Sequence, residues 1–291
     1  MIEQYVVADI GATNTRVGVY DRAGHNEGYE VQGTDPADYY GTIKALAAGV
    51  RRITGGNQVT ASAVAIATEL NAGGQIVGGG SLNKWAGNWP GLDIAAELDL
   101  PPQLSGVLND TEAIGVSQLE INRANGREAR GSGLTLSSGW GGATYSPDGT
   151  VVNDEPGHYL LREGATCPCG KDGCAEAHIS GNGVKINHGL DMQTWLETDP
   201  AAPTQLVTDI STAVIDMITR HRDHGFRDEE VRWTGSVAIQ QPMIMGRVAE
   251  KVRKELPGGH APAFDMVTLG HQAGVHGAFI KARSLADAPT S

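Results

Sequence analysis

Residues 3–20 read Glu-Gln-Tyr-Val-Val-Ala-Asp-Ile-Gly-Ala-Thr-Asn-Thr-Arg-Val-Gly-Val-Tyr, and this stretch decides the fold. The apolar run that ends at Ile10 predicts a buried strand, and residues 16–20 predict a second strand after a short polar loop. A similar stretch returns at residues 133–145, which read Gly-Leu-Thr-Leu-Ser-Ser-Gly-Trp-Gly-Gly-Ala-Thr-Tyr. Two such hairpins predict a chain of two related halves, although chance similarity of two glycine-rich hairpins stays open at this point.

Helical and strand patterns alternate along the rest of the chain, which predicts an α/β protein. We expect helices at 38–53, 204–224, 242–255 and 274–285, and strands at 60–68, 105–108 and 231–233. The expected division is a smaller lobe of residues 1–108 with approximately 274–291, and a larger lobe of residues 109–273 that holds all three cysteines.

The composition excludes several classes of function. The 291 residues include 34 acidic and 22 basic side chains, a net charge of −12, so a general nucleic-acid-binding surface is not expected. The longest apolar stretches, such as residues 61–67, are far shorter than the ~20 residues of a membrane-spanning helix. Glu3 also stands where a signal peptide would carry basic residues. These features predict a cytoplasmic protein without nucleic-acid or membrane partners.

The loop Asp9-Ile-Gly-Ala-Thr-Asn-Thr15 is a candidate phosphate site. Its backbone N–H groups and small polar side chains can donate hydrogen bonds to phosphate oxygens, and Asp9 can hold a magnesium-bound water. It is not of the Walker type, because the Lys-Ser/Thr pair and the following helix are missing. An ordinary tight turn also explains the loop when it is taken alone. The similar tip at residues 137–142 favours the phosphate site, because two such tips could face each other across a cleft.

A second candidate site follows the apolar strand that ends at Leu108. Asn109 and Asp110 stand at the carboxyl end of this strand, where open α/β sheets usually bind their ligands. A carboxylate there can accept a hydroxyl proton during phosphoryl transfer. Helix capping explains the same two residues without any catalysis, so both interpretations stay open.

The three cysteines of the chain lie within the segment Cys167-Pro-Cys-Gly-Lys-Asp-Gly-Cys174. Thiolates this dense in a cytoplasmic chain favour a structural zinc, which needs a fourth ligand. His158 and His178 both flank the segment, and their spacing does not choose between them. Free or redox-active thiols are the alternative.

Two carboxylates and an imidazole also flank this segment. Glu155 and His158 precede it, and Glu176 follows it. A loop pinned by a metal would hold these side chains near one another, and paired carboxylates suit the vicinal hydroxyls of a sugar. Taken singly, each acid is also explained as a solvated surface residue.

In this order, the motifs resemble those of the ROK family of sugar kinases and repressors. The set runs from Asp-Ile-Gly-Ala-Thr-Asn-Thr through Leu-Asn-Asp-Thr-Glu-Ala, Thr-Leu-Ser-Ser-Gly-Trp-Gly-Gly, Glu-Pro-Gly-His and the cysteine segment to Thr-Gly-Ser-Val. The resemblance covers nearly the whole chain and implies the duplicated actin-like, ribonuclease H-like fold, with two α/β lobes and a central cleft. It also implies Mg-ATP, a structural zinc, and a homo-oligomer that is a dimer or tetramer.

The resemblance implies a role for each candidate residue. Asp110 is implied as the base that takes the proton of the sugar hydroxyl, and His158 as the residue that completes the zinc site. The implied phosphate loops are Asp9, Gly11, Thr13 and Asn14, and Ser137, Ser138 and Gly139, with Gly235 and Ser236 beside the adenosine. The implied sugar contacts are Asn109, Asp110, Glu155, His158 and Glu176, and the implied zinc ligands are His158, Cys167, Cys169 and Cys174.

The sequence departs from the family pattern in several places, the mildest of which is Thr234-Gly235 in place of a Gly-Gly pair on the nucleotide side. The second phosphate loop usually reads Gly-Thr-Gly-Ile-Gly-Gly after Thr-Leu, where this chain has Ser137 and the bulky Trp140. The usual Gly-x-Pro-Gly loop is replaced by Ala67-Thr-Glu-Leu70, and Asn83 is a weak match for the asparagine that contacts the sugar. Because of these departures, the resemblance indicates the type of reaction more clearly than it indicates the sugar or the phosphoryl donor.

The activity implied by the resemblance is that of an ATP-dependent hexose kinase acting on the 6-hydroxyl of glucose. An N-acylhexosamine kinase or another hexose kinase of the same family is the alternative. A non-catalytic, sugar-responsive regulator is a further alternative. ROK repressors carry a helix-turn-helix domain before the first phosphate loop, where this sequence has eight residues, and the net charge of −12 also opposes DNA binding.

Overall fold

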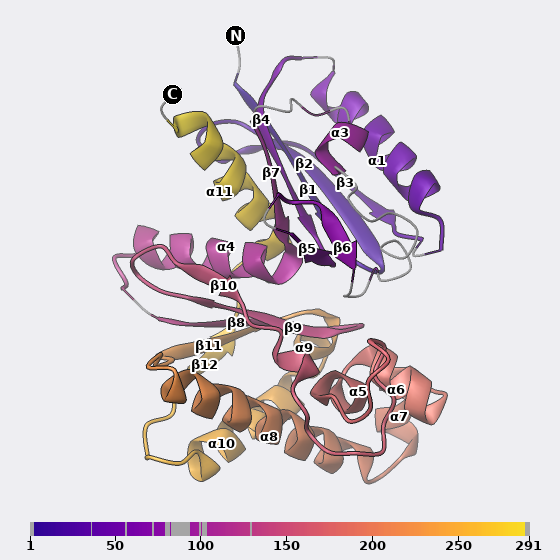
Figure 1. Ribbon diagram of the computed structural model, residues 1–291, viewed down its shortest axis with the longest axis vertical. Helices are drawn as coiled ribbons and strands as arrows, with labels where there is room; N and C mark the ends of the chain where they lie inside the picture. The colour runs from indigo at the N-terminus through magenta and orange to yellow at the C-terminus, as the bar shows by residue number, and fades with distance from the viewer. Residues whose placement is uncertain are drawn as a thin grey trace. The chain divides into compact units, whose positions relative to one another are not determined.

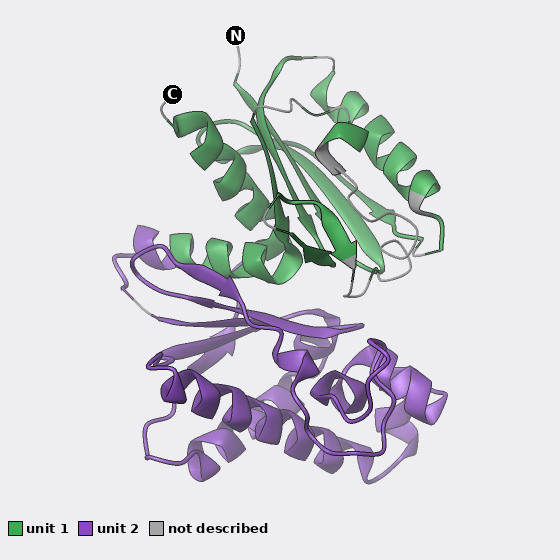
Figure 2. Cartoon of the chain, viewed as in Figure 1, with its two compact units in different colours: residues 1–120, 272–291 green, residues 121–271 purple. Residues whose placement is uncertain are grey.

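The computed structural model describes residues 3–288 except residues 36, 56, 72, 79–81, 83–93, 99, 101–103 and 129. The chain forms two compact units, Met1–Glu120 with Gln272–Ser291, and Ile121–His271 (Figure 2). The boundary after Glu120 lies inside helix α4 (Asp110–Ala124). The sequence analysis expected the boundary at residue 108.

The first unit contains a five-stranded sheet in the order β3-β2-β1-β4-β7. Strand β1 pairs antiparallel with β2 and parallel with β4, β2 pairs antiparallel with β3, and β4 pairs parallel with β7. The strands span Gln4–Ile10 (β1), Asn14–Tyr20 (β2), Asn26–Gly33 (β3), Val59–Ile66 (β4) and Ser105–Asn109 (β7). A small separate hairpin, β5 (Glu69–Leu70) with β6 (Ile76–Gly78), follows β4.

Helices cover both faces of this sheet (Figure 1). Successive side chains of a strand point to opposite faces, so β1 contributes to two apolar clusters. Val6 and Ile10 pack in the cluster that includes α1 (Tyr39–Thr54), whereas Tyr5 and Val7 pack in the cluster that includes α11 (Ala273–Asp287). The central strand is therefore buried on both sides, which explains its continuous apolar sequence.

The second unit repeats the same sheet, in the order β10-β9-β8-β11-β12. Strand β8 pairs antiparallel with β9 and parallel with β11, β9 pairs antiparallel with β10, and β11 pairs parallel with β12. The strands span Gly131–Leu136 (β8), Trp140–Tyr145 (β9), Val151–Asn153 (β10), Glu230–Thr234 (β11) and Ala263–Met266 (β12). Tyr20 ends β2 and Tyr145 ends the corresponding β9, so the internal repeat expected from the sequence is confirmed.

Helices of the second unit pack on its sheet through one apolar core (Figure 1). This core joins Trp233 of β11 to Leu206 and Ile210 of α8 and to Val248 of α10. The helices are α5 (Ala175–Ile179), α6 (Gly181–His188), α7 (Met192–Thr198), α8 (Ala202–Asp223), α9 (Ser236–Gln240) and α10 (Pro242–Glu255). Within the described residues, no helix has the length and apolar character needed to cross a membrane.

Candidate functional site

The first polar loop is a tight connection between β1 and β2. The Gly11 N–H donates to the Asn14 carbonyl at 3.0 Å, and the side chains of Thr13 and Asn14 are exposed at the tip. Asp9 lies just before the loop and is 8% exposed, with an Arg16 Nη1 at 3.2 Å from its Oδ2. Burial raises the pKa of Asp9, and Arg16 opposes that rise. The loop therefore offers exposed hydrogen-bonding groups beside a charge-balanced carboxylate.

Gly274 in the first turn of α11 allows this helix to lie against Asp9. A Cβ atom at position 274 would stand 2.8 Å from Asp9 Oδ2, which is closer than side chains tolerate. Gly274 is a residue whose role the sequence analysis missed, because nothing local to Gly274 indicates that Asp9 is its neighbour.

Asn109 and Asp110 lie at the carboxyl ends of the parallel strands. The strand register aligns Asn109 with Ile66 of β4, and Ile66 with Ile10 of β1. The buried Asn109 donates from Nδ2 to the Thr68 carbonyl at 3.0 Å and accepts from the N–H and the hydroxyl of Thr111 at 2.9 and 2.6 Å. Asn109 thus caps α4, as the capping interpretation predicted.

Asp110 is the first residue of α4 and is partly exposed. Its Oδ1 accepts the Thr111 N–H at 3.0 Å. A carboxylate at a helix N-terminus is stabilised by the unpaired N–H groups of the first turn. Its position at the end of a strand and its partial exposure are those required of a group that accepts a proton from a bound ligand.

The second polar loop joins β8 to β9 and is held by the first turn of α6. The N–H groups of Gly181 and Asn182 donate to the carbonyls of Ser137 and Ser138 at 2.8 and 2.9 Å. The Ser137 N–H donates to the Gly139 carbonyl at 2.9 Å. These bonds fix the backbone of the loop.

Trp140, the bulky departure from the family pattern, packs inward from this loop. Its side chain is 2% exposed and belongs to the apolar core of the second unit. Its backbone N–H donates to Glu176 Oε2 at 2.9 Å. The indole therefore contributes to the core rather than filling the exposed tip of the loop.

Gly235 brings the end of β11 close to the same loop. Its φ of 93° lies in the region that favours glycine, and a Cβ there would stand 2.4 Å from the Leu136 carbonyl oxygen. Thr234 pairs with Thr135 in the parallel ladder, and Ser236 then begins α9. Gly235 and Ser236 consequently lie at the strand end next to the second polar loop.

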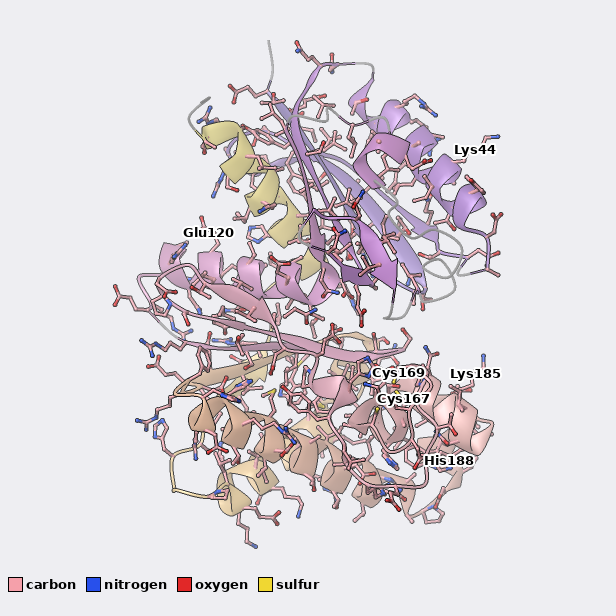
Figure 3. The ribbon with its side chains drawn as sticks, viewed as in Figure 1. Lys44, Glu120, Cys167, Cys169, Lys185 and His188 are labelled. Carbon is pink, nitrogen blue, oxygen red and sulfur yellow. The ribbon has the colours of Figure 1, made fainter. Side chains whose placement is uncertain are left out.

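His158 and the three cysteines form a compact cluster. One ligand atom from each of the four residues lies within 4.8 Å of all the others. Cys169 Sγ is 3.8 Å from Cys174 Sγ, and His158 Nδ1 is 3.9 Å from Cys167 Sγ. Zn–S and Zn–N bonds of about 2.3 and 2.0 Å in a tetrahedron separate the ligand atoms by roughly 3.5–3.8 Å. The donor set and its spacing fit a structural zinc. Figure 3 shows Cys167 and Cys169 together in the loop near α5.

His178, the other histidine beside the cysteines, points away from this cluster. Its Nε2 is 2.9 Å from the carbonyl oxygen of Arg162. The structure therefore groups His158, and not His178, with the thiols. The spacing in the sequence left this choice open because both histidines are close to the cysteines along the chain.

Glu155 and Glu176 both lie close enough to His158 to interact with it electrostatically. Glu155 adopts a φ of 36°, a backbone conformation that non-glycine residues rarely adopt, and its Oε2 is 4.0 Å from His158 Nε2. Its Oε1 accepts a hydrogen bond from Asn153 Nδ2 at 2.7 Å. Glu176 is 8% exposed, and burial raises its pKa, while the Trp140 N–H and His158 oppose that rise. The arrangement presents two carboxylates and an imidazole beside the metal cluster. Asn83, a further predicted sugar contact, lies outside the described residues.

Two units with one strand order, each with a polar loop after its first strand, define the duplicated α/β architecture of the actin-like proteins. The chain belongs to the ROK family, whose model matches residues 5–284. None of the curated proteins compared with the chain matches it.

Solved structures of ROK proteins share the fold of this chain. The ROK hexokinase from Thermus thermophilus is 23% identical, with coverage of 98% of this chain and 100% of that one and a TM-score of 0.74. The ROK family glucokinase from Streptomyces griseus, in complex with glucose and AMPPNP, is 21% identical over 97% of this chain and 99% of that one, with a TM-score of 0.75. A ROK transcriptional regulator, a homologue of the E. coli MLC protein, is 17% identical over 99% of this chain and 79% of that one, with a TM-score of 0.73.

Proposed function

We propose that this protein is an ATP-dependent sugar kinase that phosphorylates the 6-hydroxyl of glucose. The observation that carries the proposal is Asp110, a partly exposed carboxylate at the carboxyl end of β7 and the N-terminus of α4 in a chain of the ROK family. The Streptomyces griseus glucokinase, whose structure contains glucose and AMPPNP, supports glucose and ATP as the substrates. N-acylhexosamines and other hexoses are the alternative substrates of the same reaction.

In the proposed reaction, Asp110 accepts the proton of the sugar hydroxyl as that oxygen attacks the γ-phosphorus of ATP. The transition state of phosphoryl transfer is loose, so positioning and charge neutralisation matter more than a strong base. Magnesium bound with ATP supplies part of that neutralisation. Asn109 is fixed by three hydrogen bonds, and it holds the start of α4, and thus Asp110, in one place.

The nucleotide contacts follow from the two polar loops. In this proposal the first loop binds the phosphates and the magnesium-bound water, and the second loop also binds the phosphates. The first group is Asp9, Gly11, Thr13 and Asn14, the second is Ser137, Ser138 and Gly139, and Gly235 and Ser236 lie beside the adenosine. Backbone N–H groups of such loops stabilise developing negative charge because they are already oriented before the reaction.

The sugar contacts are proposed at the metal cluster. Glu155, His158 and Glu176 would bind the ring hydroxyls, and zinc held by His158, Cys167, Cys169 and Cys174 would fix that segment. Asn109 and Asp110 are the other proposed sugar contacts. We also propose that the protein acts in the cytoplasm as a homodimer or homotetramer, without nucleic-acid partners.

The decisive test is ADP release from Mg-ATP with and without D-glucose, by the wild type and by Asp110→Asn. We expect sugar-dependent release by the wild type and a fall in kcat of about 10²–10⁴-fold in Asp110→Asn, with glucose affinity retained. Asp148→Asn is a matched control, because Asp148 accepts the Thr150 N–H in an exposed turn of the second unit. Full activity in Asp110→Asn would mean that Asp110 serves only to start the helix.

A sugar-responsive regulator is the second candidate function. Its support is the fold shared with the ROK transcriptional regulator over 99% of this chain. Glucose binding without ADP release from ATP, for every hexose and donor offered, would favour this candidate over the kinase.

A further inference from the structure

A buried histidine of α8, which the sequence analysis did not single out, lies between two carboxylates. His221 is 7% exposed, its Nδ1 is 2.7 Å from Asp228 Oδ2, and its Nε2 is 2.6 Å from Asp154 Oδ2. A neutral imidazole could donate to only one of these carboxylates, and its second nitrogen would present a lone pair to the other. Both contacts are favourable when the ring carries two N–H groups.

Each carboxylate is held on its far side by a hydroxyl group. Ser132 Oγ of β8 donates to Asp228 Oδ1 at 2.6 Å, and the Tyr159 hydroxyl donates to Asp154 Oδ1 at 2.6 Å. The result is a continuous polar chain, Ser132–Asp228–His221–Asp154–Tyr159, inside the second unit. It joins the central strand of the sheet to the segment that follows β10.

One end of this chain is the hydrogen bond between Tyr159 and Asp154, and two of the proposed sugar-binding residues, Glu155 and His158, lie between these residues in the sequence. Asp154 immediately precedes Glu155, and Tyr159 immediately follows His158, so their hydrogen bond closes the segment 154–159 into a short clip. The clip contains the 3₁₀ turn Pro156–His158 and the left-handed Glu155. Unfavourable backbone conformations persist where surrounding contacts hold them in place. Asp154 is the residue next to Glu155 in the chain, and His221 holds the Asp154 side chain.

We propose that His221 is a positioning residue for sugar binding, acting through Asp154 and Tyr159 on Glu155 and His158. The proposal rests on the function proposed above, because it assumes that these two residues contact the sugar. His221 itself touches neither the sugar nor the metal. Loss of its bond to Asp154 weakens sugar binding while leaving the nucleotide loops intact.

Two substitutions at His221 separate its two hydrogen bonds. His221→Asn keeps a donor near the Nδ1 position toward Asp228 and loses the donor toward Asp154, whereas His221→Gln keeps a donor near the Nε2 position toward Asp154. We expect the KM and Kd for glucose to rise about 10- to 100-fold in His221→Asn and by less in His221→Gln, with the KM for ATP unchanged.

Tyr159→Phe removes the hydrogen bond that closes the same clip and leaves His221, Asp154 and Asp228 unchanged. It is the alternative test if His221→Asn does not fold. Its matched control is Tyr145→Phe, since the Tyr145 hydroxyl donates to the buried Glu230 at 2.5 Å in the same unit but away from the clip. Each change removes one hydroxyl from a carboxylate. We expect Tyr159→Phe to raise the Kd for glucose, and Tyr145→Phe to lower thermal stability with the Kd for glucose unchanged.

The glucose Kd is measured by calorimetry alongside the kinetics. Together the two measurements distinguish a failure of the proposed kinase function from a failure of the proposed role of His221. A wild type that neither binds nor phosphorylates any hexose would overturn both the kinase and the role of His221. A wild type that binds glucose, with folded Tyr159→Phe and His221 variants that bind it equally tightly, would overturn only the role of His221. Equal losses of glucose and ATP affinity would also overturn it, because they indicate general damage to the unit.

Discussion

Single glycines determine how closely the backbone segments around the candidate site can approach. A Cβ at Gly157 would stand 1.9 Å from the Trp140 carbonyl oxygen. No side-chain rotation relieves a contact between Cβ and a backbone atom, so any other residue there must displace the backbone. Gly157 lies between Glu155 and His158, and its small size therefore sets the distance between this turn and β9.

We expect Gly157→Ala to lower the free energy of unfolding by about 1–3 kcal/mol, because the added methyl overpacks a buried turn. Gly246→Ala is the control: position 246 lies in α10 with no atom within 4 Å of the added Cβ, so the change should stabilise the helix by about 0.5–1 kcal/mol. Urea denaturation of both variants measures the difference. An unaltered midpoint for Gly157→Ala would show that the turn can shift at no cost.

At the scale of elements, the segment between β10 and α6 contains little regular structure. It consists of short turns and helices, with isolated bridges between Leu160 and Cys174 and between Thr166 and Asp172. Its own apolar cluster is small and consists of Ala165, Cys167, Cys174 and Ala177, with Cys169 packed against it. A metal bound by His158 and the three cysteines would cross-link this segment and add to the stability that its small cluster provides.

The structure predicts about one zinc per chain, lost on removal of a ligand of the cluster. We expect His158→Gln to lower zinc content and His178→Gln to retain it, because His178 bonds to the Arg162 carbonyl outside the cluster. Mass spectrometry of metals in the purified variants measures this. Zinc-free wild-type protein that is folded and resists proteolysis in the segment would disprove the structural role of the metal.

At the scale of the whole molecule, the second unit buries a network of charged and polar side chains around Glu230. Glu230 at the start of β11 accepts from the Tyr145 hydroxyl and from Asn122, and it pairs with Arg232. Burial raises the pKa of Glu230, but these hydrogen bonds outweigh burial and lower it. The polar chain through His221 is a second buried network in the same unit. Because the proton of His221 is bound more tightly in the folded state, this network makes the stability of the protein depend on pH.

Burial lowers the pKa of His221, but the hydrogen bonds with Asp154 and Asp228 outweigh burial and raise it from 6.5 to about 9. The folded state therefore holds the proton more tightly than the unfolded state. The resulting stability is fully present below pH 6.5, declines as the pH rises, and is lost above pH 9.

We expect the wild type to lose up to about 3 kcal/mol more unfolding free energy than His221→Gln between pH 6 and pH 10. Urea denaturation across this range measures the difference, and the variant corrects for other groups that titrate above pH 8. Parallel pH curves for the two proteins would show that the folded state does not bind the His221 proton more tightly than the unfolded state.

Sequence patterns located most of the central elements. The expected helix at 242–255 matches α10, and the helices at 204–224 and 274–285 match α8 and α11 to within two residues at each end. The edge strands β3, β10 and β12 had no clear signal, because none of their side chains is fully buried in a core. The short helices α5 to α7 were missed because each is shorter than the window in which helical periodicity is visible.

By itself, the sequence determined the α/β class, the two similar polar loops and the close spacing of the three cysteines, because apolar runs, turn residues and cysteine spacing are all local properties. The tertiary structure groups His158 with the thiols, as the family resemblance implied, and it alone decided that Trp140 packs inward and that Gly274 makes room beside Asp9. It also revealed the chain of contacts through His221, whose five members come from four separate segments of the sequence. Burial and hydrogen-bond partners depend on which segments fold together, and no local pattern encodes that.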